Sequence, residues 1–192
     1  MKRIHKGEPG YLKSQRTLEI IKAVVAFALV LAVFLAGYLH THTKANLMTV
    51  VAILGCLPAS KVMVGVITRF PYQSIDAEKA NEIRSKTENL MVIYDMIITS
   101  REKIMPVDCI VIFGHTVCGY TCSEKMDLNY INGYIKEMLG QNQIQKVSVK
   151  IFHDYVKFFT RAEGMNSMAA IDQPEEREIE ERIRQLILSI SM

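Results

Sequence analysis

Two long apolar stretches near the start dominate the pattern of hydrophobic and polar positions along the chain. The first, residues 23–39 (AVVAFALVLAVFLAGYL), is uncharged and extends roughly 25 Å as a helix. The second, residues 47–67 (LMTVVAILGCLPASKVMVGVI), is interrupted only by Pro58 and Lys61. With residues 18–21 added to the first stretch, both are long enough to cross the hydrocarbon core of a bilayer, so the pattern predicts a membrane hairpin.

The hairpin divides the N-terminal part of the chain into five segments. We predict a basic N-terminus, a first transmembrane helix, an external loop, a second transmembrane helix and a linker, at residues 1–16, 17–39, 40–46, 47–67 and 68–75. A secretory signal peptide is the alternative for the first helix. The length of the apolar run, the lack of a small-residue cleavage site and the second apolar segment all favour the hairpin.

Charged side chains lie within both predicted spans. Lys61 is about 9 Å of helix rise from residue 67, so it is predicted to reach the headgroups, with an intramembrane ion or lipid site as the alternative. Glu19 and Lys22 are three residues apart and are predicted to pair or to extend to the headgroups.

Small residues recur at every fourth position on both spans. Such stripes let helices approach closely, and we expect them to close the hairpin, with association to another membrane protein as the alternative. The residues concerned are Ala28, Ala32, Ala36, Gly55 and Ala59.

Basic residues flank one side of the hairpin. Five of them precede the first span, whereas the loop HTHTKAN contains only Lys44. Cytoplasmic segments are enriched in Lys and Arg, so we predict a multi-pass protein of the plasma (inner) membrane with both termini in the cytoplasm. His40 and His42 of the loop are expected to be solvated.

From residue 76 the pattern changes to that of a soluble α/β domain, predicted over residues 76–165. A charged helix with Asp76 as its N-cap precedes a strand at 90–99, whose continuous apolar run is typical of burial on both faces. The predicted fold class is therefore a membrane α-helical hairpin plus a cytoplasmic α/β domain, with the core order α-β-β-β-α-β-α and a C-terminal amphipathic helix.

The remaining core elements follow from the same periodicities. Gly114 and His115 form a two-residue hairpin turn between two strands. A helix capped by Asp127, an alternating strand and a helix starting at Asp154 come next. The predicted ranges are 105–113, 116–122, 127–140, 146–152 and 154–163, with Val156, Phe159 and Ala162 on the inner side of the last helix.

A polar connection at 166–173 leads to the last helix, residues 174–192, which Pro174 opens. Its first turn is acidic, and its apolar side chains form one stripe, made of Ile179, Ile183, Leu186, Ile187 and Ile190. Packing on its own domain is the simpler explanation for this stripe, and contact with a partner protein is the alternative.

The net charge of +3 conceals an asymmetry along the chain. Residues 1–70 carry nine basic and two acidic side chains, whereas residues 71–192 carry fourteen and eighteen. The soluble part is therefore acidic. Because phosphate recognition requires a basic surface, nucleic acid is not an expected partner.

Four potential metal ligands fall within fourteen residues: Cys109, His115, Cys118 and Cys122. Structural zinc sites usually draw on a C-x2-C pair, and on a strand Cys118 and Cys122 would lie roughly 13 Å apart. We expect these cysteines and Cys56 to be free thiols in a reducing cytoplasm, with zinc binding as the alternative.

The order helix, three strands, helix, strand over residues 76–152 resembles the restriction-endonuclease-like superfamily, including its nuclease-related branch. In that family an Asp on the second strand and an acidic-x-Lys triplet on the third bind magnesium. The segment 107–112 (VDCIVI), followed by a glycine hairpin, is similar to the first element. The resemblance implies that Asp108 occupies the position of the first magnesium ligand.

The third predicted strand departs from the family pattern. Residues 117–122 (VCGYTC) contain no carboxylate and no lysine, and Glu124 and Lys125 are adjacent, so they point to opposite faces of a strand. We therefore predict no catalytic, cofactor-binding or metal-binding residue. A displaced magnesium site formed by Asp108, Glu124 and Asp127 is the alternative.

These patterns predict a membrane-anchored docking or accessory module, with a divergent magnesium-dependent nuclease as the alternative. The expected partners are the lipid bilayer and another protein, bound through the C-terminal helix or the hairpin, and a homo-oligomer is left open. A small transporter or channel subunit has only Pro58 and Lys61 in its favour.

Overall fold

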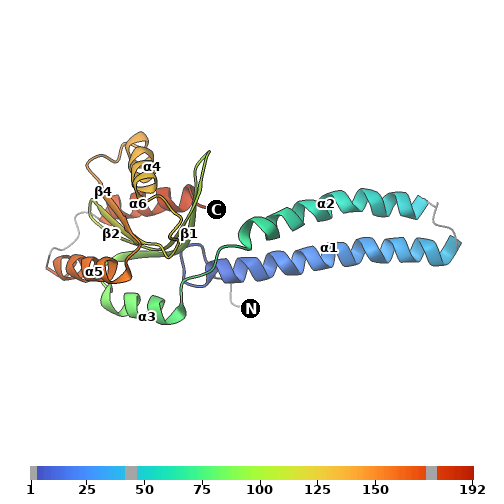
Figure 1. The fold of residues 1–192 in the computed structure, drawn as a ribbon, viewed down its shortest axis with the longest axis horizontal. Coiled ribbons are helices and arrows are strands. Elements are labelled where there is room, and N and C mark those ends of the chain that lie inside the picture. The colour runs from blue at the N-terminus through green and yellow to red at the C-terminus, as the bar shows by residue number, and fades with distance from the viewer. Residues whose placement is uncertain (1–3, 42–46, 172–176) are drawn as a thin grey trace. The chain divides into compact units, whose positions relative to one another are not determined.

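The computed structural model describes residues 4–41, 47–171 and 177–192. The chain divides into two compact units. One unit is Leu12–Gln73, and the other combines Met1–Tyr11 with Ser74–Met192 (Figure 1). The second unit is therefore assembled from sequence on both sides of the first.

The first unit is a hairpin of two helices, α1 (Tyr11–Thr41) and α2 (Leu47–Arg69). Both are long and apolar enough to span a membrane, and only 11% of the most apolar window of each is buried. α1 begins six residues before the predicted span, because no helix-breaking residue occurs between Gly10 and that span. Most of the predicted loop, including His42 and Lys44, lies outside the described residues.

Small side chains line the contact between the two helices. A Cβ atom at Gly55 would lie 3.2 Å from Val30 Cγ2, and one at Gly65 would lie 3.2 Å from Glu19 Oε2. As the residue number rises on one helix it falls on the other, so the helices are antiparallel. The buried small residues of this seam are Ala23, Gly37, Ala52 and Ala59.

The seam on α1 differs from the predicted stripe. Ala28, Ala32 and Ala36 are all exposed, whereas Ala59 on α2 is buried as expected. The prediction for α1 was wrong because this helix offers small residues on two faces, and spacing alone does not distinguish them.

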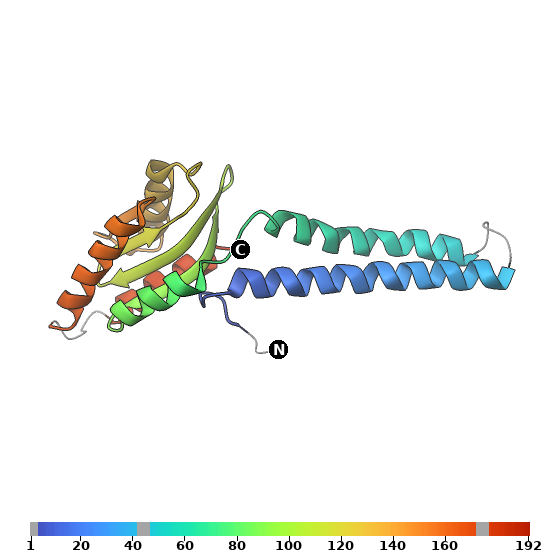
Figure 2. The same cartoon turned by 60° about the horizontal axis from the view of Figure 1, so that its bottom comes forward.

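The second unit is a three-layer α/β/α domain around one mixed sheet (Figures 1 and 2). Its strands follow each other in space in the order of the sequence. β1–β2 and β2–β3 are antiparallel, and β3–β4 is parallel across the α4 crossover. The bounds are α3 (Ala77–Lys86), β1 (Met91–Thr99), β2 (Ile104–Phe113), β3 (Thr116–Tyr120), α4 (Leu128–Gln141), β4 (Ser148–Phe152), α5 (Tyr155–Ala169) and α6 (Arg177–Ser189).

This element order agrees with the predicted one, and Gly114, with φ +51°, makes the expected turn between β2 and β3. Asp127 and Asp154 cap α4 and α5 through two backbone N–H groups each. Asp76 precedes α3 but makes no side-chain capping bond. α4 continues past Gly140 to Gln141.

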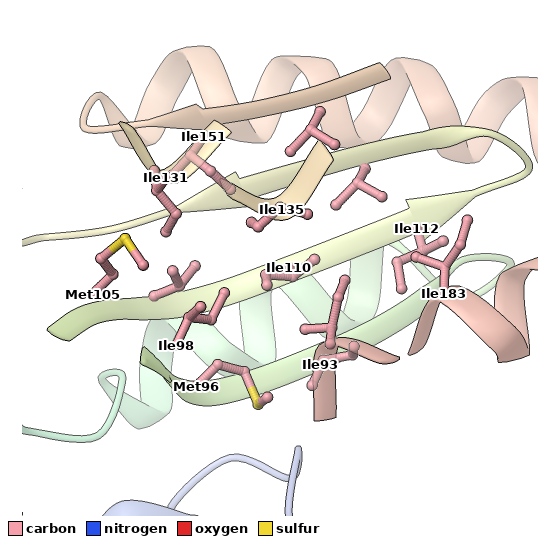
Figure 3. Packing of buried hydrophobic residues seen from close by; sticks show 14 of the residues in the cluster. Ile93, Met96, Ile98, Met105, Ile110, Ile112, Ile131, Ile135, Ile151 and Ile183 are labelled. Atoms are coloured by element: carbon pink, nitrogen blue, oxygen red, sulfur yellow. The ribbon is translucent and has the colours of Figure 1, made fainter. Parts of the chain in front are cut away.

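Each face of the sheet has its own apolar core. α4 and α6 cover one face, which is rich in isoleucine (Figure 3). α3 and α5 cover the other, around Phe158 and Tyr94. Fully burying one such side chain stabilises the fold by roughly 1.5–3 kcal/mol, so the two layers together hold the sheet in place.

Two predictions about the helices are settled by this packing. The stripe of α6 lies against the sheet of its own domain, with Ile183 and Ile187 fully buried. On α5 the inner side chains are Phe158, Ala162 and Met165, whereas Val156 is 70% exposed. The predicted inner face of α5 was wrong for Val156 because the helix is rotated towards Phe158. Pro174 lies outside the described residues.

The edge strand β1 is covered by both ends of the domain. Gly7 O accepts the N–H of Tyr94 at 2.9 Å, and Ser191 bridges to Ile98. Lys6 Nζ donates to Leu188 O at 2.8 Å and to Ser191 O at 2.6 Å, at the C-terminal end of α6. That residues 4–11 belong to the domain was not predicted from the sequence.

Candidate functional site

Asp108 lies on β2 at an interruption of the sheet ladder. Tyr94 pairs with Cys109 and Met96 with Val107, so Asp95 and Asp108 come opposite each other. Asp95 has φ +56°, a left-handed conformation that is uncommon for residues other than glycine, although Asp adopts it more readily than most. Both carboxylates are buried, and Asp95 Oδ1 accepts the N–H of Ile75 at 2.9 Å.

The carboxylate of Asp108 holds the segment that follows β3. Oδ2 accepts the N–H of Cys122 at 2.6 Å, and the Cys122 thiol donates to Oδ1 at 3.6 Å. Burial raises the pKa of Asp108 above its usual value, against the hydrogen bonds from Cys122 and the positive charge of Lys79. Burial and the Asp108 carboxylate also raise the pKa of the Cys122 thiol to about 11. This thiol is therefore not an activated nucleophile.

Aromatic rings adjoin Asp108. Tyr120 and Tyr155 pack edge to face at 5.4 Å, and Lys79 Nζ lies 5.9 Å from one ring centroid and 5.4 Å from the other. Tyr155 donates to Glu82 at 2.6 Å. Burial first, and Asp108 second, raise the pKa of Tyr120. Lys79 is thus the cation that faces this group.

On β3, the positions that carry the catalytic triplet in the resembled family are occupied by core residues. Cys118 and Tyr120 belong to the core beneath α5. A Cβ atom at Gly119 would come within 2.5 Å of Ile151 Cδ1, so this position has no room for a side chain. The strand that carries the triplet in the resembled family therefore has no carboxylate or lysine here, and its residues from Val117 to Tyr120 are buried.

The alternative magnesium ligands do not converge. Asp127 caps α4 and lies 3.8 Å from Lys103 Nζ, Glu124 is exposed, and Asp108 is occupied by Cys122. Within residues 4–41, 47–171 and 177–192, no three His, Cys, Asp or Glu side chains come together as a metal site. In the structure Asp108 is a buried carboxylate whose oxygens accept the N–H and the thiol of Cys122, in the segment after β3.

The four cysteines, all among the described residues, are free thiols. Cys109 and Cys118 are buried beneath α3 and α5, and burial raises the pKa of Cys118 to about 12. His115 precedes β3 and Cys122 follows it, so they lie at opposite ends of that strand. The alternative zinc set is therefore not assembled.

A cavity of about 1020 Å³ opens between the N-terminal segment, α3 and the edge of β1. Its wall combines apolar residues of β1 with polar residues of mixed charge, among them His5, Glu8, Asn81, Arg84 and Glu88. Sequence reasoning missed this cavity because residues 4–9 form one of its walls from a distant part of the chain.

A second, shallower hollow of about 620 Å³ runs along α5. Val156, Gly164 and Met168 line it together with the basic side chains Lys157 and Arg161. Lys157 is paired with Asp154 at 3.5 Å. This face combines exposed apolar side chains with basic ones, whereas the domain as a whole carries a net negative charge.

Charged side chains of the hairpin gather near one end. Glu19 pairs with Lys22 at 3.8 Å, and the guanidinium of Arg16 lies 4.3 Å from the ring centroid of Phe70. Lys61 is exposed, as are His40 in the last turn of α1 and Cys56 on α2. The pairing of Glu19 with Lys22 is as predicted.

The sequence matches no known protein family, and no curated protein or solved structure is significantly similar to it.

Proposed function

We propose that the chain is a membrane-anchored module whose α/β domain lies in the cytoplasm and acts by docking rather than by catalysis. The anchor is supported by the exposure of α1 and α2. Most of the large apolar side chains exposed among the described residues belong to these two helices, for example Leu29, Leu39, Leu54 and Leu57. Water disfavours such a surface, whereas a bilayer accommodates it.

The topology is supported by the assembly of the domain. Residues Met1–Tyr11 and Ser74–Met192 form one unit, although the hairpin separates them in sequence. If α1 and α2 cross a membrane, both ends of the hairpin must emerge on the same side. The excess of Lys and Arg before α1, against the single Lys44 of the loop, favours the cytoplasmic side.

A non-catalytic role is supported by the environment of Asp108. Its oxygens are engaged by Cys122, and the adjoining β3 positions are core residues. The cavity beside β1 and the hollow along α5 remain as surfaces that a partner can enter, since α6 uses its stripe within the domain.

The anchor is tested by alkaline carbonate extraction of membranes, in which the chain is expected to remain in the pellet. Its topology is tested with single cysteines placed at Glu8 and Lys136, both exposed, in a chain whose exposed Cys122 is replaced by serine, and a membrane-impermeant maleimide. Both sites should react in inside-out vesicles and neither in intact cells. Release by carbonate, or opposite labelling of the two sites, contradicts the proposal.

Docking is tested by purification of the full chain in a mild detergent. A reproducible, stoichiometric companion protein is expected, and a chain that is always isolated alone counts against docking.

One observation favours the nuclease alternative: the element order places a buried carboxylate, Asp108, on the second strand. Magnesium-dependent cleavage of DNA and RNA by the wild-type chain, lost in Asp108→Asn, would support it. Equal behaviour of the two proteins would remove it.

A further inference from the structure

Lys22 and Lys61 lie at the same level of the hairpin. Glu19 faces Gly65 across the seam, where a Cβ atom would be 3.2 Å from the Glu19 carboxylate. One turn further along α1 leads to Lys22, and one turn back along α2 leads to Lys61. Because the helices are antiparallel, both steps go in the same direction along the hairpin, and both keep to the same face.

This group of three charged side chains has an unbalanced positive charge. Glu19 is mostly buried and pairs with Lys22, whose side chain is 62% exposed. Lys61 is exposed, and the ion pairs seen among the described residues do not include it. Two ammonium groups thus accompany one carboxylate. In an apolar environment an uncompensated ammonium is costly, and it seeks an anion.

Apolar side chains continue from each lysine towards the loop end of the hairpin. On α2, Leu57 and Leu54 follow Lys61 at helical spacing, and on α1, Val25 and Leu29 follow Lys22; all four are exposed. Cations at one level, with an apolar track leading away from them in one direction, match the chemistry of a phospholipid. The headgroup phosphate meets the ammonium groups, and the acyl chains follow the track.

Resting on the proposed membrane anchor, we infer that Lys22 and Lys61 form a binding site for the phosphate of an anionic phospholipid of the cytoplasmic leaflet. Glu19 positions Lys22 through their ion pair, and Gly65 leaves room for the Glu19 carboxylate beside the seam. Lys61 makes the decisive contact, because it supplies the excess charge.

The site is tested on the full chain in detergent micelles containing phosphatidylglycerol or phosphatidylcholine, with bound lipids counted by native mass spectrometry. Wild-type protein should retain phosphatidylglycerol in preference to phosphatidylcholine. Lys61→Gln should weaken this retention about fivefold, since one basic residue near an anionic lipid surface contributes roughly that factor. Lys61→Arg should retain the lipid, and Lys136→Gln, which removes the same charge from the exposed surface of α4, should leave retention unchanged.

Three outcomes overturn the site: equal retention of both lipids, unchanged retention in Lys61→Gln, or displacement of phosphatidylglycerol by millimolar glycerol 3-phosphate, which would indicate a site for free phosphate. Helix content measured by circular dichroism shows that each variant is folded. Failure of the membrane anchor is distinguished by carbonate extraction, since a chain that stays in the pellet but shows no lipid preference refutes only the lipid site.

Discussion

The backbone carbonyl of Gly7 accepts the amide N–H of Tyr94 at 2.9 Å, which joins the segment before α1 to a strand that follows α2. This bond closes a loop of chain that contains the entire hairpin. The N-terminal segment is therefore a structural part of the α/β domain, and Lys6 contributes to it by donating to the end of α6.

Gly7 is a position where a side chain is expected to destabilise the domain. Its φ is +92°, and a Cβ atom would lie 3.0 Å from Ile93 Cγ2 and 3.3 Å from Leu188 Cδ2. Gly7→Val should lower the free energy of unfolding by about 1–3 kcal/mol, measured by thermal or urea denaturation. Gly133→Ala, in open space on α4, is the control and should be neutral or slightly stabilising. Equal effects of the two changes would contradict this account.

Lys6 is expected to stabilise the end of α6. Its ammonium donates to two carbonyl oxygens, those of Leu188 and Ser191, and Lys6→Met keeps the apolar stem but removes both bonds. We expect a loss of about 1.5–3 kcal/mol in the free energy of unfolding. Lys136→Met, at an exposed position of α4, should change it little. Faster amide exchange at residues 190–192 in Lys6→Met would locate the effect.

Glu180 caps the turn between β2 and β3. Its carboxylate accepts the N–H of Gly114 at 2.7 Å, and the residue is buried. Glu180→Ala should cost about 1–3 kcal/mol, because a buried donor loses its acceptor. Glu180→Gln keeps an oxygen acceptor and should recover most of that loss. If both variants unfold at the same denaturant concentration, the bond contributes nothing.

Asp108 is expected to make stability fall as the pH rises. Burial raises its pKa in the folded state above the unfolded value, so the folded state binds the proton more tightly. Its favourable contribution is complete below the unfolded pKa of about 4 and is lost as the pH rises through the folded pKa. Asp108→Asn should therefore be more stable than wild type at pH 7, with the difference narrowing on acidification.

Two comparisons control the Asp108 experiment. Asp108→Ala leaves the N–H of Cys122 without its acceptor and should cost about 1–3 kcal/mol. The pH dependence of stability due to Asp154 has the opposite sign. The N–H of Lys157 lowers the pKa of the Asp154 carboxyl, so its contribution to stability is lost as the pH falls. Wild type more stable than Asp108→Asn at pH 7 would refute the assignment.

The contact between the two hairpin helices is tested by replacing a small side chain with a larger one. Ala59 is 1% exposed, so Ala59→Leu should separate the helices and cost about 1–3 kcal/mol in detergent. Ala28→Leu, on the exposed face of α1, should be close to neutral. Thermal unfolding of both variants in the same micelle decides between them, and the reverse order of stability would restore the predicted stripe.

The sequence by itself determined the two apolar helices, the order of the domain elements and the caps Asp127 and Asp154. These features are local: an apolar run, a period of 2 or 3.6 residues, and a side chain two or three residues from the N–H groups it binds. Even the absence of a carboxylate on β3 could be predicted at this level.

The tertiary structure alone decided which face of α1 forms the seam, that Val156 points outward, and that Lys6 and Gly7 belong to the domain. It also decided that the Asp108 carboxylate accepts hydrogen bonds from Cys122. Each of these depends on a contact between distant parts of the chain. Local periodicity does not specify such contacts, because a helix that is apolar on every side and a carboxylate within a strand are compatible with several partners.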